Sequence, residues 1–429
     1  MMLGKAEYDA GIIEQSGIKQ ITTEEITKKL DEYADEYKTV FPNSTQKKYF
    51  NTYLRGLLSN LDRKSIEPIA CHFLSPVEVR GMQHFFKRSI LPESELRNVY
   101  QKNLSVRLNA ANGMINADGS DFVKKGSHSV GVARQYCGRL GKTENCQAGV
   151  FVSYASEKGY GLTDGRLYIP KSWFGNDYAE RCKESGIPDD QTFKTKNEIA
   201  AEMIKQTYES GLFGARWVGC DAAFGADHHF LDALPKELYY FAGIPENERI
   251  FRQWPPVDMP DENQPATGRK RKYPRVTEKS EMVKDIAADD TIPWQEVVLC
   301  EGSKGPITAS VKYMRCVRCD TLTGKNNYLI PVAEVWLYIR KYQNGDIKYF
   351  FSNAPADIPA EQLHRASTMR WSIEQCFGEC KSYLGMAHYE SRTYKGWHRH
   401  MLMVMIAHLF TIDLRLFYKK KLIPYHAHG

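Results

Sequence analysis

Three charged residues in one short run have side chains that could bind a phosphate and a metal ion. In RWSIEQCFGECK, residues 370–381, Arg370, Glu374 and Lys381 follow one another at spacings of four and seven residues. In a single helix these spacings place all three side chains along one stripe, beside an apolar face. One interpretation is an ion pair on a solvated edge, which contributes only about 0.2–0.5 kcal/mol and is weaker with arginine first. In the other, Glu374 binds a metal ion and the two cations hold a polyanion over it.

The metal-binding interpretation requires further carboxylates, and two acids stand where predicted strands end. Asp118 follows GMINA and Asp221 follows RWVGC, and small residues come after each. Open sheets bind ligands at the carboxyl ends of their strands, so we expect both side chains at such an edge. Either acid alone is more typical of a turn or a helix N-cap. Asp121 is a rival for the first position, and so is Asp164, although its Asp-Gly pair is typical of a turn.

Asp118, Asp221 and Glu374 together give three hard oxygen donors. Such a set suits two Mg²⁺ ions, or Mn²⁺ in their place, bound through carboxylates and a substrate phosphate. Two ions of this kind activate a water or a 3′-hydroxyl and stabilise the leaving oxygen of a phosphodiester. The three residues are therefore predicted to be both metal ligands and catalytic residues.

The elements predicted around these acids alternate between strand and helix. GMINAD, SVGVARQYC and QAGVFVSYAS are typical of strands, FKTKNEIAAEMIKQTYES of a helix, and RWVGCD and YYFAGIP of further strands. This order predicts an α/β fold with a mixed sheet flanked by helices. EVVLCEG, ITASVKYMRC, NYLIPVAEVWLYIRKY and IKYFFSN are again typical of strands, whereas the chain before residue 105 and after residue 358 is helical in pattern.

Five segments follow from these patterns. They are an acidic N-terminal arm (1–45), a helical region (46–108), the first part of the α/β core (109–250), a β-rich insertion (251–350), and the second part of the core with C-terminal helices (351–429). The role of the arm is not predicted.

Charge is distributed unevenly along the chain. The net charge is +6, and residues 361–429 hold ten Lys and Arg against five Asp and Glu. Residues 1–45 hold five against nine. A basic C-terminal part favours an anionic partner, with nucleic acid the first choice.

The apolar stretch 401–412 is too short to span a bilayer and contains His408, so we expect a buried helix and no membrane. No secretory signal is apparent, which favours a cytoplasmic protein whose ten cysteines are reduced. Cys316 and Cys319 have a metal-like spacing but no clear second pair, so ordinary thiols are favoured over zinc.

Several long motifs carry a resemblance to a known family. They are DGSDFVKKGSHSVGVARQYCGRLGKTENCQAGVFVSYAS, RLYIPKSW, WVGCDAAFG and RWSIEQCFGECKSYLGMAHYESRTYKGWHRH. With these motifs the chain resembles a bacterial DDE transposase over approximately residues 45–415. It is most similar to the insertion sequence 701 family, whose ribonuclease-H-like core is interrupted by a β-rich insertion. The resemblance implies a metal-dependent endonuclease and strand transferase that acts on terminal inverted repeats and target DNA. It also implies a hairpin intermediate and a homodimer in the DNA complex.

The family's acids match residues of this chain. Asp118 matches the first aspartate, Asp221 the second and Glu374 the glutamate. The first motif differs, because DGSDF stands where the family usually has DDTGF. Asp121 is therefore the alternative to Asp118 as first ligand.

The related group's signature, Y-x2-R-x3-E-x6-K, is matched in its last three positions by Arg370, Glu374 and Lys381, whereas Ser367 replaces the tyrosine. The resemblance assigns Arg370 and Lys381 to phosphates that flank the scissile bond. The helical region 46–108 is predicted to bind DNA and to recognise the element's ends, and further candidates for contact with DNA follow. They are Lys124, Lys125 and His128 after the first acid, Trp294 or Trp336 as a platform for a displaced base, and Lys395, His398 and Arg399 near the C-terminal helix. Trp336 and the basic residues are equally typical of core packing and solvated loops.

Three other functions remain open. They are a domesticated relative that binds DNA without cutting it, a nuclease that cuts without joining, and a metalloenzyme with another substrate. The intact set of three acids argues against lost catalysis. Terminal repeat and target sequences do not follow from the chain.

Overall fold

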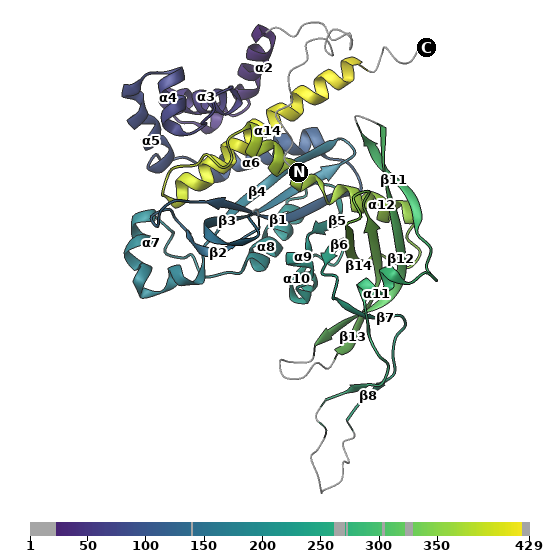
Figure 1. Cartoon of the computed structure of the whole chain (residues 1–429). Coiled ribbons are helices and arrows are strands. Elements are labelled where there is room, and N and C mark those ends of the chain that lie inside the picture. Colours follow the sequence, from purple (N-terminus) through teal and green to yellow (C-terminus); the bar gives the residue numbers. More distant parts are fainter. Residues whose placement is uncertain are drawn as a thin grey trace. The chain divides into compact units, whose positions relative to one another are not determined.

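The computed structural model describes residues 23–422, except for residues 139, 261–270, 272, 303–304 and 322–328. It divides into two compact units (Figure 1). The helical unit comprises the described residues up to 103, together with 380–390 and those from 399 onward. Its elements are α2 (Thr23–Asp35), η1 (Lys38–Val40), α3 (Ser44–Leu58), α4 (Ile66–Phe73), η2 (Pro76–Glu78), α5 (Val79–Lys87), most of α6 (Glu93–Leu108) and most of α14 (Tyr394–Leu422).

Aromatic side chains form the core of the helical unit. Tyr37 and Phe50 are fully buried with their rings 5.6 Å apart. The Tyr33 hydroxyl donates to the Ile406 carbonyl at 2.7 Å, which joins α2 to α14. Residues 23–45 thus pack with the helices that follow them, and the division at residue 45 falls inside one unit. Residues 1–22 of the predicted arm lie outside the described residues.

Helix α14 contains the apolar stretch noted in the sequence. It is longer than that stretch, and by length and composition alone its segment Tyr394–Tyr418 would suffice to cross a membrane. Every residue from Met401 to Phe410, His408 included, is nevertheless buried inside the fold. The prediction of a buried helix here is confirmed.

The second unit comprises residues 104–379 and 391–398 and is built on a mixed sheet (Figure 1). At its centre β1 (Gly113–Val123) pairs in parallel with β5 (Ala215–Cys220), β5 in parallel with β6 (Tyr239–Ile244), and β1 antiparallel with β3 (Lys142–Ser156). β2 (Ala133–Cys137) and β4 (Gly159–Tyr168) both pair with β3. Helix α8 (Lys196–Glu209), which begins with a capping box of Thr195 and Glu198, packs against β1, β3 and β4. The predicted mixed α/β fold of ribonuclease-H-like type is confirmed.

The predicted β-rich block is also a set of strands, and they extend the central sheet. β14 (Ile347–Ser352) pairs with β6, and the order continues through β13 (Leu329–Lys341), β12 (Gly305–Thr321), β7 (Arg249–Phe251) and β10 (Glu281–Met282). The remaining described elements are β8 (Val257–Asp258), β9 (Arg275–Val276), β11 (Gln295–Gly302), η3 (Lys171–Phe174), η4 (Asn176–Tyr178), α7 (Ala179–Ser185), α9 (Ala222–Gly225), α10 (His228–Ala233), α11 (Val283–Ala288), α12 (Ala360–Met369) and α13 (Ser372–Tyr383).

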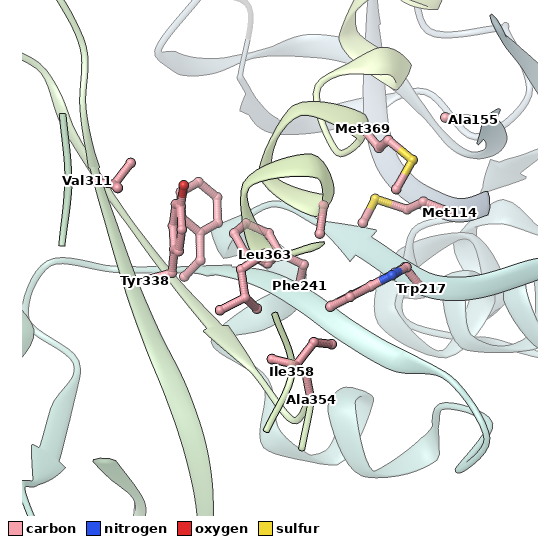
Figure 2. Packing of buried hydrophobic residues seen from close by; sticks show 12 residues of the cluster. Met114, Ala155, Trp217, Phe241, Val311, Tyr338, Ala354, Ile358, Leu363 and Met369 are labelled. Carbon is pink, nitrogen blue, oxygen red and sulfur yellow. The ribbon is translucent and has the colours of Figure 1, made fainter. Parts of the chain in front are cut away.

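A buried apolar cluster fixes α12 on the sheet. Leu363 and Met369 of this helix pack with Met114 of β1, Trp217 of β5 and Phe241 of β6. Figure 2 shows Met369 beside Met114, at the end of α12. The packing therefore determines where α12 stops, and so where the run that contains Arg370 and Glu374 begins.

The turn predicted at Asp164 is wrong. Asp164 lies within β4, opposite Val152 of β3, at a shift in the register of the two strands. The glycine after it is required by packing rather than by a turn, because a Cβ on Gly165 would lie 2.5 Å from the buried ring of Phe151. Asp164 is itself buried beside Arg166, with 3.7 Å between Oδ2 and Nε.

Candidate active site

Asp118 lies inside a strand. β1 continues to Val123 and pairs with β3 throughout, with Asp118 opposite Phe151. The predicted loop directly after Asp118 is therefore wrong, because pairing with β3 outweighs the turn-like composition of DGS. Side chains alternate along a strand, so Asp118 is on the same face as Asn116 and Met114, which α12 covers.

Asp121, the rival first ligand, is on the other face of β1, three residues further on. Its Oδ2 accepts a hydrogen bond from the Gly138 N–H at 2.8 Å, and its Oδ1 lies 4.0 Å from Lys196 Nζ. These contacts hold its carboxylate in the loop after β2.

Asp221 directly follows β5, as predicted, and is the N-cap of α9. Its Oδ1 accepts from the Ala223 N–H at 3.0 Å. Ala117 of β1 pairs with Cys220 of the adjacent parallel strand β5. Asp118 directly follows the first of these paired residues, and Asp221 directly follows the second. The N-cap interpretation is thus correct for Asp221 without removing it from the neighbourhood of Asp118.

Close packing behind Asp221 should make this corner sensitive to one methyl group. A Cβ on Gly225 in α9 would lie 2.1 Å from the carbonyl oxygen of Gly243 in β6. Gly225→Ala is therefore expected to lower the free energy of unfolding in urea by about 1–3 kcal/mol. Gly378→Ala is the matched control, because its Cβ meets nothing within 4 Å and its helix should gain up to about 1 kcal/mol. Equal stability of the two variants would contradict the close contact.

The run 370–381 is not one helix. Arg370 is the C-cap of α12, and α13 starts at Ser372, with Glu374 in its first turn and Lys381 in its last. At the break, the Met369 carbonyl accepts a hydrogen bond from the buried Asn116 side chain at 3.2 Å. The predicted common stripe is therefore wrong for Arg370.

Glu374 is nevertheless paired with Arg370, as the ion-pair interpretation requires. The Arg370 guanidinium contacts Oε1, and Trp371 Nε1 donates to Oε2 at 2.7 Å. Both carboxylate oxygens are thus occupied. As they stand, no three His, Cys, Asp or Glu side chains among the described residues are arranged to hold a metal ion. Trp371 is a contact that the spacing of charges did not indicate.

Asp118, Asp221, Glu374 and Arg370 are close enough to influence one another's charge. Burial, and after it the neighbouring Asp221, raise the pKa of Asp118 to about 8, although Arg370 opposes the shift. Burial also raises the pKa of Asp221, again opposed by Arg370, and Glu374 acts on both aspartates in the same direction as burial. Carboxylates that favour protonation because they are buried and close to one another fit a divalent cation, which would supply further positive charge.

The basic residues predicted to contact DNA lie on separate elements, some after β1 and one in α13. Lys124 and Lys125 follow β1 about 20 Å along the chain from Asp118, at about 3.3 Å per residue. Asn145 Nδ2 donates to the Lys124 carbonyl at 2.7 Å, and the Lys125 side chain is exposed, as is His128. Lys381 lies two helical turns beyond Glu374 in α13.

Trp294 is half-buried beside two cations. Lys312 Nζ lies 4.7 Å and Lys341 Nζ 5.9 Å from the centre of its ring. Trp336, the other candidate platform, is also partly buried; it packs against the cluster that holds α12, and its Nε1 donates to the Pro355 carbonyl at 3.0 Å.

Three other candidates are held inside the fold. Ser367, at the position of the signature tyrosine, is fully buried and accepts from Arg340 Nη1 at 2.7 Å. Arg399 is buried and donates to carbonyls of Phe85 and Ser89 near the end of α5. His398 is buried in the second unit, where its Nδ1 lies 3.0 Å from the Tyr394 carbonyl oxygen.

Cys316 and Cys319 are buried free thiols in β12 whose pKa values burial raises to about 12. That they are ordinary thiols rather than zinc ligands stays a prediction.

The sheet order, with one acid on β1 and another directly after β5, is that of the ribonuclease-H-like class of folds. The model of the DDE superfamily endonucleases matches residues 36–306, more than half of the chain. The chain belongs to this family. Glu374 lies beyond the matched residues, whereas Asp118 and Asp221 lie within them.

The chain is also similar to the probable transposase for insertion sequence element IS701 of Microchaete diplosiphon. The two are 29% identical over 223 residues, which cover 52% of this chain and 55% of that protein. The chain thus spans about half the length of the curated relative it matches. The resemblance to the insertion sequence 701 family is confirmed.

Proposed function

We propose that this protein is a DDE transposase that cuts DNA at the terminal inverted repeats of a mobile element and joins the freed 3′ ends to target DNA. The observation that carries the proposal is the placement of Asp118 on β1 and of Asp221 directly after the adjacent strand β5, with the Arg370–Glu374 pair acting on both. Membership of the endonuclease family and the similarity to an insertion sequence transposase support it.

Asp118 and Asp221 would hold two Mg²⁺ ions, or Mn²⁺ in their place. Glu374 would complete the set once its carboxylate leaves Arg370 and Trp371. Bound there, the ions supply positive charge to the scissile phosphate and lower the pKa of the attacking hydroxyl or water. These residues fit the ions by their chemistry, since all three are hard oxygen donors.

Arg370 changes partner in this scheme. Its guanidinium exchanges Glu374 for a phosphate oxygen beside the scissile bond, and its Nη1 is already buried without a hydrogen-bond partner among the described residues. A planar guanidinium suits this exchange, because it binds carboxylate and phosphate with the same fork.

The remaining contacts extend along the DNA. Lys381, Lys124 and Lys125 bind backbone phosphates, and Trp294 stacks on a base displaced from the duplex. The helical region binds the element ends, and two copies hold the two ends together. The protein acts in the bacterial cytoplasm.

Purified protein incubated with Mg²⁺, a DNA fragment that ends in the native terminal repeat, and a supercoiled target plasmid tests the proposal. We expect cleaved ends first and fragment joined to plasmid later. Cleavage without joined product would favour a nuclease, and binding of the ends without cleavage a domesticated relative. Binding must weaken as salt rises, because Lys and Arg contacts to phosphates release counterions.

A further inference from the structure

One buried amide joins the elements that carry the three acids. Asn116 is fully buried in β1, and its Nδ2 donates to the Met369 carbonyl at 3.2 Å and to Ser372 Oγ at 3.1 Å. Only the amide nitrogen is able to donate to a carbonyl, so the Met369 contact fixes which end of the amide faces the helix junction. A single side chain therefore ties β1 to the junction of α12 and α13.

The other end of the same amide lies against β5. Gly219 is the register partner of Asn116, and a Cβ there would lie 2.1 Å from Asn116 Oδ1 and 3.1 Å from Arg370 Cγ. Only a glycine allows the amide and the arginine stem to approach β5 this closely. Oδ1 itself is buried and has no hydrogen-bond partner among the described residues.

The contacting residues share one relation to the acids. Asn116, Gly219 and Ser372 each come two residues before one of the three acids assigned to the metal ions. Residues two apart in a strand project from the same face, so the amide lies next to Asp118 on its own face of β1. β1, β5 and α13 are therefore in contact at residues that lie two positions before the three acids.

We propose that Asn116 is a positioning residue of the active site, which sets the separation of the three acids through its contacts with Met369, Ser372 and Gly219. These four residues form the Asn116 clasp. The clasp holds Asp118 and Asp221 ready for a metal ion before DNA arrives. This inference rests on the proposed function, because it gives Asn116 its role through the metal-binding acids.

The clasp has an energetic cost that an apolar residue would avoid. A buried polar atom without a partner is destabilising, and Oδ1 is such an atom among the described residues. A leucine would remove that cost but would leave the Met369 carbonyl, one of the last acceptors of α12, without a donor. The amide is thus explained by what it connects rather than by the stability it adds.

Gln147 offers a matched control. It is fully buried in β3 of the same sheet, its Nε2 donates to the Val130 carbonyl at 2.6 Å, and its Oε1 also lacks a partner among the described residues. Gln147→Ala therefore removes a comparable buried amide, but one whose hydrogen bond goes to Val130 and not to the junction of α12 and α13. Asn116→Ala and Gln147→Ala should lower stability alike and differ at the metal site.

The test titrates the DNA-free full chain with Mn²⁺ and follows the rise in its unfolding temperature. Wild type and Gln147→Ala should share one midpoint, whereas Asn116→Ala should require about 10- to 100-fold more Mn²⁺, as is typical when a residue supporting metal ligands is removed. Binding of element ends in EDTA should stay within about twofold of wild type. The kcat for cleavage should fall by a factor similar to the midpoint shift.

Ser372→Ala keeps the proposal testable if Asn116→Ala does not fold, since it removes only the Oγ acceptor. It should shift the Mn²⁺ midpoint in the same direction by a smaller factor. Equal midpoints for wild type, Ser372→Ala and every folded amide variant would overturn the clasp. So would a wild type that Mn²⁺ does not stabilise, because the clasp is inferred to preform the site. If the Mn²⁺ midpoints of the variants shift as expected but wild type cuts no element ends, the proposed function is refuted and the clasp is retained.

Discussion

Excision of a marked element should fall by about a thousandfold or more in each of Asp118→Asn, Asp221→Asn and Glu374→Gln. Each change replaces a carboxylate by a neutral amide of nearly the same shape. It therefore removes one negative charge from the ligands of the metal ions while leaving packing intact. Single losses from a catalytic set commonly cost this much or more, and such losses are not additive. The measurement is excision of a marker flanked by the native element ends from a plasmid in cells, with the repaired donor junction sequenced.

Asp121→Asn is the matched control for the first position. Its carboxylate is on the opposite face of β1 and is engaged by Gly138 and Lys196, so excision should persist. Excision that survives Asp118→Asn and is lost in Asp121→Asn would reverse the assignment of the first ligand. Excision that survives all three triad changes would refute the metal site as a whole.

Stability without metal should fall as pH rises from about 4 to about 8. The pKa of Asp118 is raised from its ordinary value near 4 to about 8 in the folded chain, so between these values the folded state binds more protons than the unfolded state. The stability of the folded state then decreases with pH. Asp118→Asn has no proton to lose, so at pH 8 in EDTA it should exceed wild type by at least about 1.4 kcal/mol more than at pH 4, the equivalent of one pKa unit.

Urea unfolding at pH 4 and pH 8, with EDTA or with Mn²⁺, measures this effect. Mn²⁺ at pH 8 should restore the stability of wild type and do less for Asp118→Asn, because the cation replaces the proton on the carboxylate. Gln147→Ala changes no titratable group, so its difference from wild type should be the same at both pH values. A constant difference between Asp118→Asn and wild type would show that Asp118 is not the buried acid described.

Local patterns were sufficient for the strands and helices that carry the acids, and insufficient for where those elements end. β5 and the position of Asp221 follow from an apolar run before small residues. β1 extends past DGS because β3 pairs with it, and Asp164 lies in a strand because Phe151 requires a glycine beside it. Such pairings depend on residues far away in the chain.

For the candidate site, too, local contacts were predictable from the sequence and long-range contacts were not. The charges of Arg370 and Glu374 pointed to their pairing, which is local. Asn116 gave no signal, because one asparagine in an apolar run does not indicate that it binds the chain more than 250 residues later, at Met369 and Ser372.

The inserted strands have one further consequence, for any attempt to make a smaller version of the protein. β14 lies beside β6, five of whose six residues are buried. Without β14, a nearly continuous apolar strand would present its unpaired N–H and C=O groups to other chains, which invites aggregation. The sheet order ends instead on the short strands β10 and β2. A shortened version that keeps Ile347–Ser352 is therefore expected to aggregate less than one that ends before this strand, because β6 then stays paired.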